Sequence, residues 1–144
     1  MRAQRVVRST LRSMPDTNLS AVEVTLVVLA TNDHISFARL NTTAVAGKVG
    51  FDYDAIEDVR IAVSELCGTV IACAAPDSEL RLDIRGGADG LEVSGRATMA
   101  AGATLEPDEL SDQVLKVVSD EYSYDVANGE ASFRMTRAAR SDAE

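Results

Sequence analysis

The feature that most constrains the fold of this chain is a helical repeat of apolar residues between positions 52 and 76. Apolar side chains recur there at intervals of three or four residues, which places them on one face of an α-helix. Asp52 or Tyr53 is expected to begin the helix, and Pro76 to close it, because proline cannot continue a helix. A helix with one apolar face must bury that face against another layer. The stripe consists of Ile56, Val59, Val63, Leu66, Val70 and Ala74.

Two segments before this helix predict a strand and a shorter helix. Residues 21–30 are rich in β-branched residues, alternate at first and then become apolar on both faces, which is typical of a strand in a sheet. Asn32 and Asp33 can cap a helix that Gly47 and Gly50 would end. The apolar positions of that helix are predicted to be Ile35, Phe37, Leu40 and Ala44.

The second half of the chain predicts two β-hairpins. Residues 80–95 alternate in polarity around a glycine-rich turn, and residues 122–135 do so around Asn128-Gly129. Between them, residues 96–112 lack a pattern, as lids and partner-binding loops do, and residues 114–118 predict a short helix. Helices and strands are therefore segregated. The predicted fold class is α+β: a two-layer sandwich of a mainly antiparallel or mixed sheet with two to three helices on one face.

Length and apolar content bound the domain organisation. At 144 residues the chain has the size of one domain, expected over residues 20–138. Residues 1–19 are expected to form a mobile basic tail without the apolar region of a secretory signal, and residues 139–144 a C-terminal tail. The longest apolar run, residues 24–30, is far shorter than the roughly 20 residues of a membrane-spanning helix. No membrane contact is expected.

Charge and cysteine content exclude two further classes of function. Fourteen Lys and Arg against 23 Asp and Glu give a formal net charge of −9, so no broad phosphate-binding surface and no direct nucleic-acid binding are expected. An acidic balance attracts a basic protein or peptide partner, and it also serves solubility alone. With one histidine and no paired Cys or His motif, no metal ligand set is present.

The segment FDYDAIEDVRIAVSELCGTVIACA, residues 51–74, resembles the second helix of the RsbW-like anti-sigma serine kinases of Gram-positive bacteria. An aromatic-led turn precedes an acidic Ile56-Glu57-Asp58 opening, and Ile61-Ala62-Val63-Ser64-Glu65 follows with a cysteine two residues later. The final hairpin, ending at residues 133–137, agrees with the family in order and length, so the resemblance covers roughly residues 20–138. It implies a Bergerat-type (GHKL) fold, which the histidine-kinase and Hsp90-type ATPases share.

The nucleotide chemistry of that family depends on three features, and this sequence departs from each. A glutamate acts on the attacking group and an asparagine four residues later holds Mg²⁺; here Glu65 is present, but Thr69 replaces the asparagine. Gly95 stands about where the family's adenine-binding aspartate belongs. The lid before the last helix has one glycine and the acids Glu106, Asp108 and Glu109, which would repel a triphosphate. A degenerate, actinobacterial-type pseudokinase with no cofactor is therefore expected.

The resemblance implies a cytoplasmic, stoichiometric anti-sigma factor that binds a sigma factor and is released by an anti-anti-sigma (STAS-type) protein, as in partner switching. Its sigma-facing surface would lie over residues 33–52, with Arg39 and Lys48 as candidate contacts. Residues 21–30 are a candidate edge strand for a homodimer. The alternative is an ATP- and Mg²⁺-dependent protein serine kinase of the same family that phosphorylates its antagonist, with Glu65 as base and Thr69 as the metal contact. A sensor or adaptor with another partner is the third reading.

Overall fold

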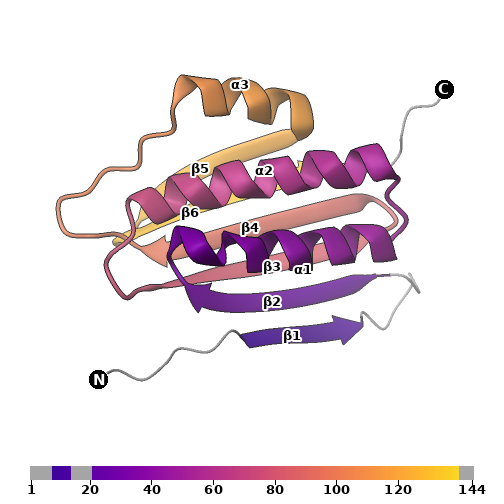
Figure 1. The fold of residues 1–144 in the computed structure, drawn as a ribbon, viewed down its shortest axis with the longest axis horizontal. Helices are drawn as coiled ribbons and strands as arrows, with labels where there is room; N and C mark the ends of the chain where they lie inside the picture. Colours follow the sequence, from indigo (N-terminus) through magenta and orange to yellow (C-terminus); the bar gives the residue numbers. More distant parts are fainter. Residues whose placement is uncertain (1–7, 14–20, 140–144) are drawn as a thin grey trace.

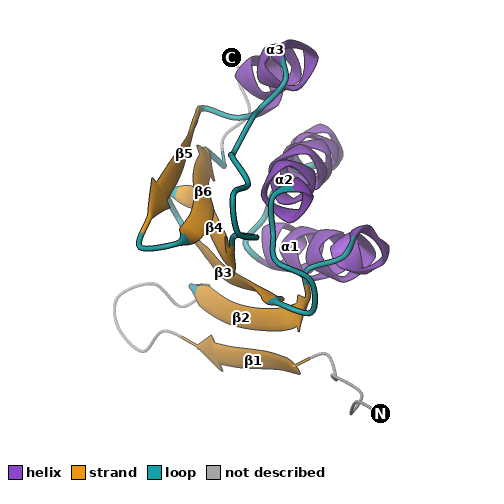
Figure 2. Cartoon of the chain, turned by 90° about the vertical axis from the view of Figure 1, so that its left-hand side faces the viewer, coloured by secondary structure: helices purple, strands orange, loops and turns teal. Residues whose placement is uncertain are grey.

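A computed structural model describes residues 8–13 and 21–139 as a two-layer α+β sandwich. One layer is a six-stranded sheet, antiparallel at every pairing, and three helices cover one of its faces (Figures 1 and 2). This confirms the predicted fold class. The strand order is β1-β2-β3-β4-β6-β5. The elements are β1 Arg8–Ser13, β2 Val22–Leu29, a 3-10 turn Asn32–His34, α1 Ile35–Lys48, α2 Tyr53–Ala72, β3 Glu79–Gly87, β4 Gly90–Thr98, α3 Glu109–Val118, β5 Glu121–Ala127 and β6 Glu130–Arg137.

Helix α2 forms as its apolar repeat predicts. The Asp52 carboxylate caps its first turn by accepting a hydrogen bond from the Ala55 N–H at 2.9 Å. The side chains at the centre of the stripe are fully buried against the sheet, and the helix ends at Ala72, four residues before Pro76. Burying four such apolar side chains contributes roughly 1.5–3 kcal/mol each. These four are Val59, Val63, Leu66 and Val70.

Helix α1 has the predicted bounds but buries a different face. Of the four predicted apolar positions only Ile35 is buried, whereas Leu40 is 65% exposed and Ala44 is exposed. Small side chains allow α1 to approach the sheet and α2 closely. The face of α1 that carries them is therefore the buried one, although it is not the face with the largest apolar side chains. The prediction of the buried face was therefore wrong. The buried row is Ile35, Ala38, Thr42, Val45 and Ala46.

Both predicted hairpins are present, and the second turns at Asn128 and Gly129, whose φ angles are 54° and 77°. Positive φ at both central residues matches the twist of the flanking strands. The connection between β4 and α3 is shorter than predicted, because β4 extends to Thr98 and α3 begins at Glu109. Met99, the first residue of this connection, is fixed to the second hairpin because its N–H donates a hydrogen bond to the Gly129 carbonyl at 2.9 Å.

The N-terminal segment differs from the predicted tail. Residues 8–13 form β1, which pairs with β2 in antiparallel register and places Arg12 opposite Glu23. An unpaired strand edge exposes N–H and C=O groups, which this pairing satisfies along β2. Residues 21–30 are consequently not an edge: β2 lies between β1 and β3, and β1 and β5 end the sheet. Residues 1–7, 14–20 and 140–144, which hold the rest of the predicted tails, lie outside the described residues.

One hydrophobic core lies between the sheet and the helices. Among the described residues, its buried members come from β2, β3, β4 and β6 and from all three helices. No helix within residues 8–13 and 21–139 combines the length and apolar content needed to cross a membrane.

Candidate functional site

Glu65 and Thr69 lie on the flank of α2, beside the buried stripe rather than on it. Both side chains are partly buried. The Thr69 hydroxyl donates a hydrogen bond to the Glu65 carbonyl oxygen at 3.1 Å, as threonine commonly does one turn back along a helix. The Thr69 hydroxyl is thus already engaged with the backbone of its own helix.

Tyr124 of β5 lies against this flank of α2. Its hydroxyl oxygen is buried and has no hydrogen-bond partner among the described residues, although the Thr69 hydroxyl is close by. Burial raises the pKa of Tyr124; the proximity of Thr69 opposes this, and the negative charges of Glu65 and Asp112 add to it. Sequence analysis did not single out this residue. The alternation of Tyr122 and Tyr124 in a predicted strand could have indicated that both side chains lie on the same face of the sheet. Both face the helices.

Gly95 lies inside β4 and not at its end. It is buried and pairs with Leu82 on β3 and Phe133 on β6. A Cβ atom at this position would lie 2.5 Å from Cε2 of the Phe133 ring and 2.8 Å from Cζ. The ring therefore occupies the space that any side chain at residue 95 would need, and a carboxylate is larger still.

Acidic side chains already occupy the N-terminus of α3. The Asp108 carboxylate caps the helix by accepting a hydrogen bond from the Ser111 N–H at 2.7 Å, and Glu109 and Asp112 lie in its first turn. A helix N-terminus favours negative charge, and these carboxylates supply it. A phosphate group would meet three acids where a phosphate-binding helix offers free N–H groups.

The two candidate partner contacts differ in environment. Arg39 of α1 is partly buried and reaches α2, where its Nη1 donates a hydrogen bond to Ser64 Oγ at 3.2 Å. Lys48 is exposed in the last turn of α1. Both lie on α1, apart from the pair formed by Glu65 and Thr69, which faces β5. The structure therefore separates the predicted site residues into two regions.

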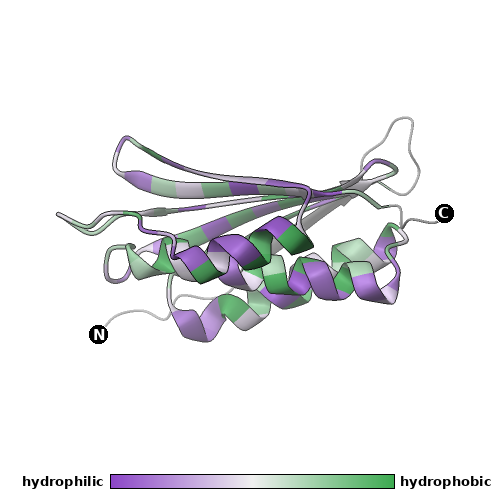
Figure 3. Ribbon diagram, turned by 90° about the horizontal axis from the view of Figure 1, so that it is seen from above, coloured by the Kyte–Doolittle hydropathy of each residue, from purple (hydrophilic) through white to green (hydrophobic). Residues whose placement is uncertain are grey.

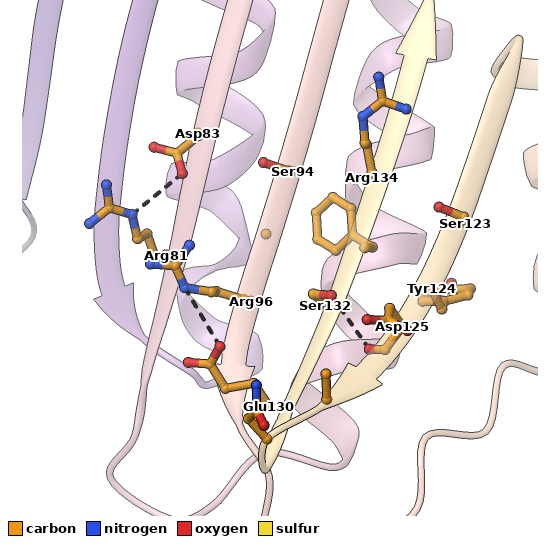
Figure 4. Close-up of a pocket in the computed structure, with 14 residues that line it drawn as sticks. Arg81, Asp83, Ser94, Arg96, Ser123, Tyr124, Asp125, Glu130, Ser132 and Arg134 are labelled. Atoms are coloured by element: carbon orange, nitrogen blue, oxygen red, sulfur yellow. Dashed lines mark hydrogen bonds and ion pairs between the residues drawn. The ribbon is translucent and has the colours of Figure 1, made fainter.

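A third region is the uncovered face of the sheet, where a shallow hollow has a volume of about 450 Å³ (Figure 4). Charged side chains line it, and each arginine is within ion-pair distance of an acid. Arg134 Nε lies 2.7 Å from Glu92 Oε2, Arg81 Nε lies 3.4 Å from Asp83 Oδ2, and Arg96 Nε lies 3.9 Å from Glu130 Oε1. Such exposed pairs contribute little to stability, and they leave the face close to electrically balanced.

No three His, Cys, Asp or Glu side chains within the described part of the chain lie close enough together to hold a metal ion. Neither Glu65 nor Thr69 lines the hollow in Figure 4 or three other hollows on the surface of the described residues.

Comparison with known proteins supports the family resemblance. No protein-family model matches the chain. An anti-sigma-F factor RsbW of Mycobacterium tuberculosis is 31% identical over 98 residues, which are 68% of this chain and 58% of that protein. A serine-protein kinase RsbW of Listeria innocua is 35% identical over 74 residues, which are 49% of this chain and 47% of that protein. The chain thus matches about half the length of these curated relatives. By sequence similarity and by its α+β sandwich, the chain is RsbW-like.

Proposed function

We propose that this protein is a stoichiometric anti-sigma factor that sequesters a sigma factor and releases it to an anti-anti-sigma (STAS-type) antagonist, without nucleotide chemistry. Similarity to proteins named anti-sigma-F factor and serine-protein kinase RsbW supports the general class. The choice of a binding protein over a kinase within that class rests on the side chains around α2. In this proposal the protein acts in the cytoplasm, where sigma factors bind RNA polymerase.

The observation that carries the proposal is that side chains of this protein already occupy the positions where a nucleotide and its metal would bind. Mg²⁺ requires near-octahedral oxygen ligands, and the Thr69 hydroxyl, which stands in place of an amide oxygen, is bonded to its own helix and faced by Tyr124. The Phe133 ring fills the space beside Gly95, and Asp108 caps the helix that would meet phosphate. The residues present thus do not fit an ATP–Mg²⁺ complex at any of the three points, and we expect no cofactor.

The partner surface in this proposal is the exposed side of α1. Lys48 and Leu40 are solvent-exposed on it. Arg39 presents its guanidinium at the α1–α2 boundary, where it donates a hydrogen bond to the neutral Ser64 hydroxyl. A cation that is partly desolvated gains most from a carboxylate supplied by a partner. We therefore expect acidic residues on the sigma factor to meet Arg39 and Lys48. A homodimer of this chain remains part of the proposal, with β1 rather than β2 at the sheet edge.

The alternative function is a protein serine kinase that uses ATP and Mg²⁺ to phosphorylate its antagonist. One observation favours it: Glu65 is present and partly buried, and the family resemblance assigns that position to the general base. In that case Glu65 would accept the proton of the substrate hydroxyl, and Thr69 would contact the metal after its hydroxyl leaves the Glu65 carbonyl. We rank it second because the chain departs from the family pattern at all three features and keeps only the glutamate of the first.

Calorimetric titration and co-purification separate the two functions. We expect no heat of binding from ATP with Mg²⁺, whereas micromolar affinity, about −8 kcal/mol, would overturn the proposal. A sigma factor from the same genome should co-purify with the tagged chain in a fixed ratio. Glu65→Ala should leave that complex unchanged, while Arg39→Glu with Lys48→Glu should break it. Phosphate transfer to an antagonist that disappears in Glu65→Ala would establish the kinase instead.

A further inference from the structure

Helix α3 carries a row of apolar side chains of which two are largely exposed to solvent. Leu110 is 69% exposed and Val117 is 80% exposed, and with half-buried Val114 they stand at spacings of four and three residues, on one side of the helix. The buried residues Leu115 and Val118 fix the helix to the domain, and Val114 also packs against the core with part of its side chain. We call Leu110, Val114 and Val117 the α3 stripe.

The surroundings of the α3 stripe are acidic. Residues 104–125 contain seven Asp and Glu and a single basic residue, Lys116. That lysine is already paired, since its Nζ lies 3.3 Å from Asp112 Oδ2. The other acids lie at both ends of the helix and along β5, so a molecule that covers the stripe must pass close to several of them. They are Glu106, Asp108, Glu109, Asp120, Glu121 and Asp125.

We propose that the α3 stripe is a docking surface for a basic amphipathic helix of a partner protein. Its apolar face would cover Leu110, Val114 and Val117, and its Lys and Arg side chains would meet the acids at the two ends of α3. Exposed apolar residues that occur singly need no explanation, but a row on one helix face with a mostly acidic rim matches the chemistry of such a partner.

This surface is separate from the one proposed for the sigma factor. Helix α2 lies between α1 and α3 in the helix layer, and α3 forms its outer margin (Figures 1 and 2). Figure 3 views the molecule from the α3 side and shows hydrophobic and hydrophilic residues interspersed along the helices. The inference holds whether or not α1 binds a sigma factor, because it uses none of the same residues.

The test measures binding of a synthetic helical peptide by fluorescence anisotropy. The probe is a labelled peptide of about four helical turns with leucines on one face and lysines on the other. We expect L110S/V117S to weaken its affinity by about tenfold or more, since two apolar side chains are lost from the contact. Glu109→Gln should weaken it less, and higher ionic strength should weaken it for every variant. The matched control is Leu40→Ser, which replaces an equally exposed leucine on α1 and should leave the affinity unchanged.

Three results would overturn the proposal. A scrambled peptide of the same composition that binds equally well would show attraction by charge alone. An equal loss of affinity in Leu40→Ser would place the peptide elsewhere. A wild-type dimer in sedimentation velocity that L110S/V117S converts to monomer would assign the stripe to a second copy of this chain. Circular dichroism and melting temperature confirm that each variant is folded before binding is compared.

Discussion

Gly95→Ala is expected to destabilise the protein because the space beside residue 95 is already filled. Gly95 is buried in β4, and its Cβ position lies 2.5 Å and 2.8 Å from two atoms of the Phe133 ring and 3.3 Å from Leu82 Cδ1. Carbon atoms pack favourably at about 3.5–4.0 Å, so the ring must retreat by about 1 Å. Phe133 is only 2% exposed, which leaves it little room to do so.

The expected loss follows from two opposing contributions. One extra carbon forced into a well-packed core costs about 1–3 kcal/mol. Alanine also reduces the conformational freedom of the unfolded chain, which offsets about 0.4–1 kcal/mol. The free energy of unfolding should therefore fall by about 1–2 kcal/mol, and the melting temperature by roughly 4 °C for a domain of this size. A Gly95→Asp substitution, which supplies the adenine-binding carboxylate of the family, should cost more.

Gly68→Ala provides the matched control. Gly68 lies inside α2, and its Cβ position has no atom within 4 Å, so alanine meets open space and should gain up to about 1 kcal/mol from helix propensity. Urea unfolding followed by circular dichroism measures both variants. Replacing the ring by a smaller side chain, as in Gly95→Ala with Phe133→Leu, should restore part of the lost free energy of unfolding. Wild-type stability of Gly95→Ala, or an equal loss in Gly68→Ala, would refute the packing argument.

Three further predictions concern buried groups. The raised pKa of Tyr124 means that the folded chain holds the phenolic proton more tightly than the unfolded chain, so the free energy of unfolding should fall as pH rises above about 10. Tyr124→Phe should weaken this dependence in urea titrations and cost less than about 1 kcal/mol at neutral pH, because the hydroxyl has no hydrogen-bond partner among the described residues. Arg137 Nη2 lies 2.9 Å from Asp58 Oδ2, and the two side chains are 18% and 33% exposed. A double-mutant cycle with Asp58→Asn and Arg137→Met should give a coupling free energy of about 1 kcal/mol. A coupling near zero would contradict this expectation. Burial raises the pKa of the Cys67 thiol to about 12 and also raises that of Cys73, so a thiol reagent at about pH 8 should label neither residue until the chain unfolds.

The parts of the fold that could be predicted from the sequence are those in which local pattern and tertiary burial agree. In α2, the stripe, the Asp52 cap and Pro76 all indicate the same helix, and the structure contains it. Asn128-Gly129 determines the second hairpin through its backbone conformation alone. The order of these elements then allows few arrangements, so the two-layer sandwich followed.

The parts that could not be predicted depend on contacts between distant segments. Apolarity alone selected Leu40 for the buried face of α1, but the close approach of that helix requires small side chains such as Ala38 and Ala46. Strand β1 lacks a strong pattern of its own and is ordered by pairing with β2. Tyr124 meets Thr69 only because β5 packs beneath the helices, which a local pattern does not reveal.

The same geometry explains how such a chain can keep its fold while its site changes. The side chains of α2 that hold the helix to the sheet, such as Val63 and Leu66, point into the core, whereas Glu65 and Thr69 stand on the neighbouring flank. A substitution on that flank alters the groups facing β5 without removing buried apolar area, so it costs little stability. Gly95 is different, because the Phe133 ring occupies the space beside it in the core. A substitution should therefore be tolerated at Thr69, as in Thr69→Asn, and resisted at Gly95, as in Gly95→Asp. The difference in unfolding free energy between those two variants measures how much more tightly residue 95 is packed than residue 69.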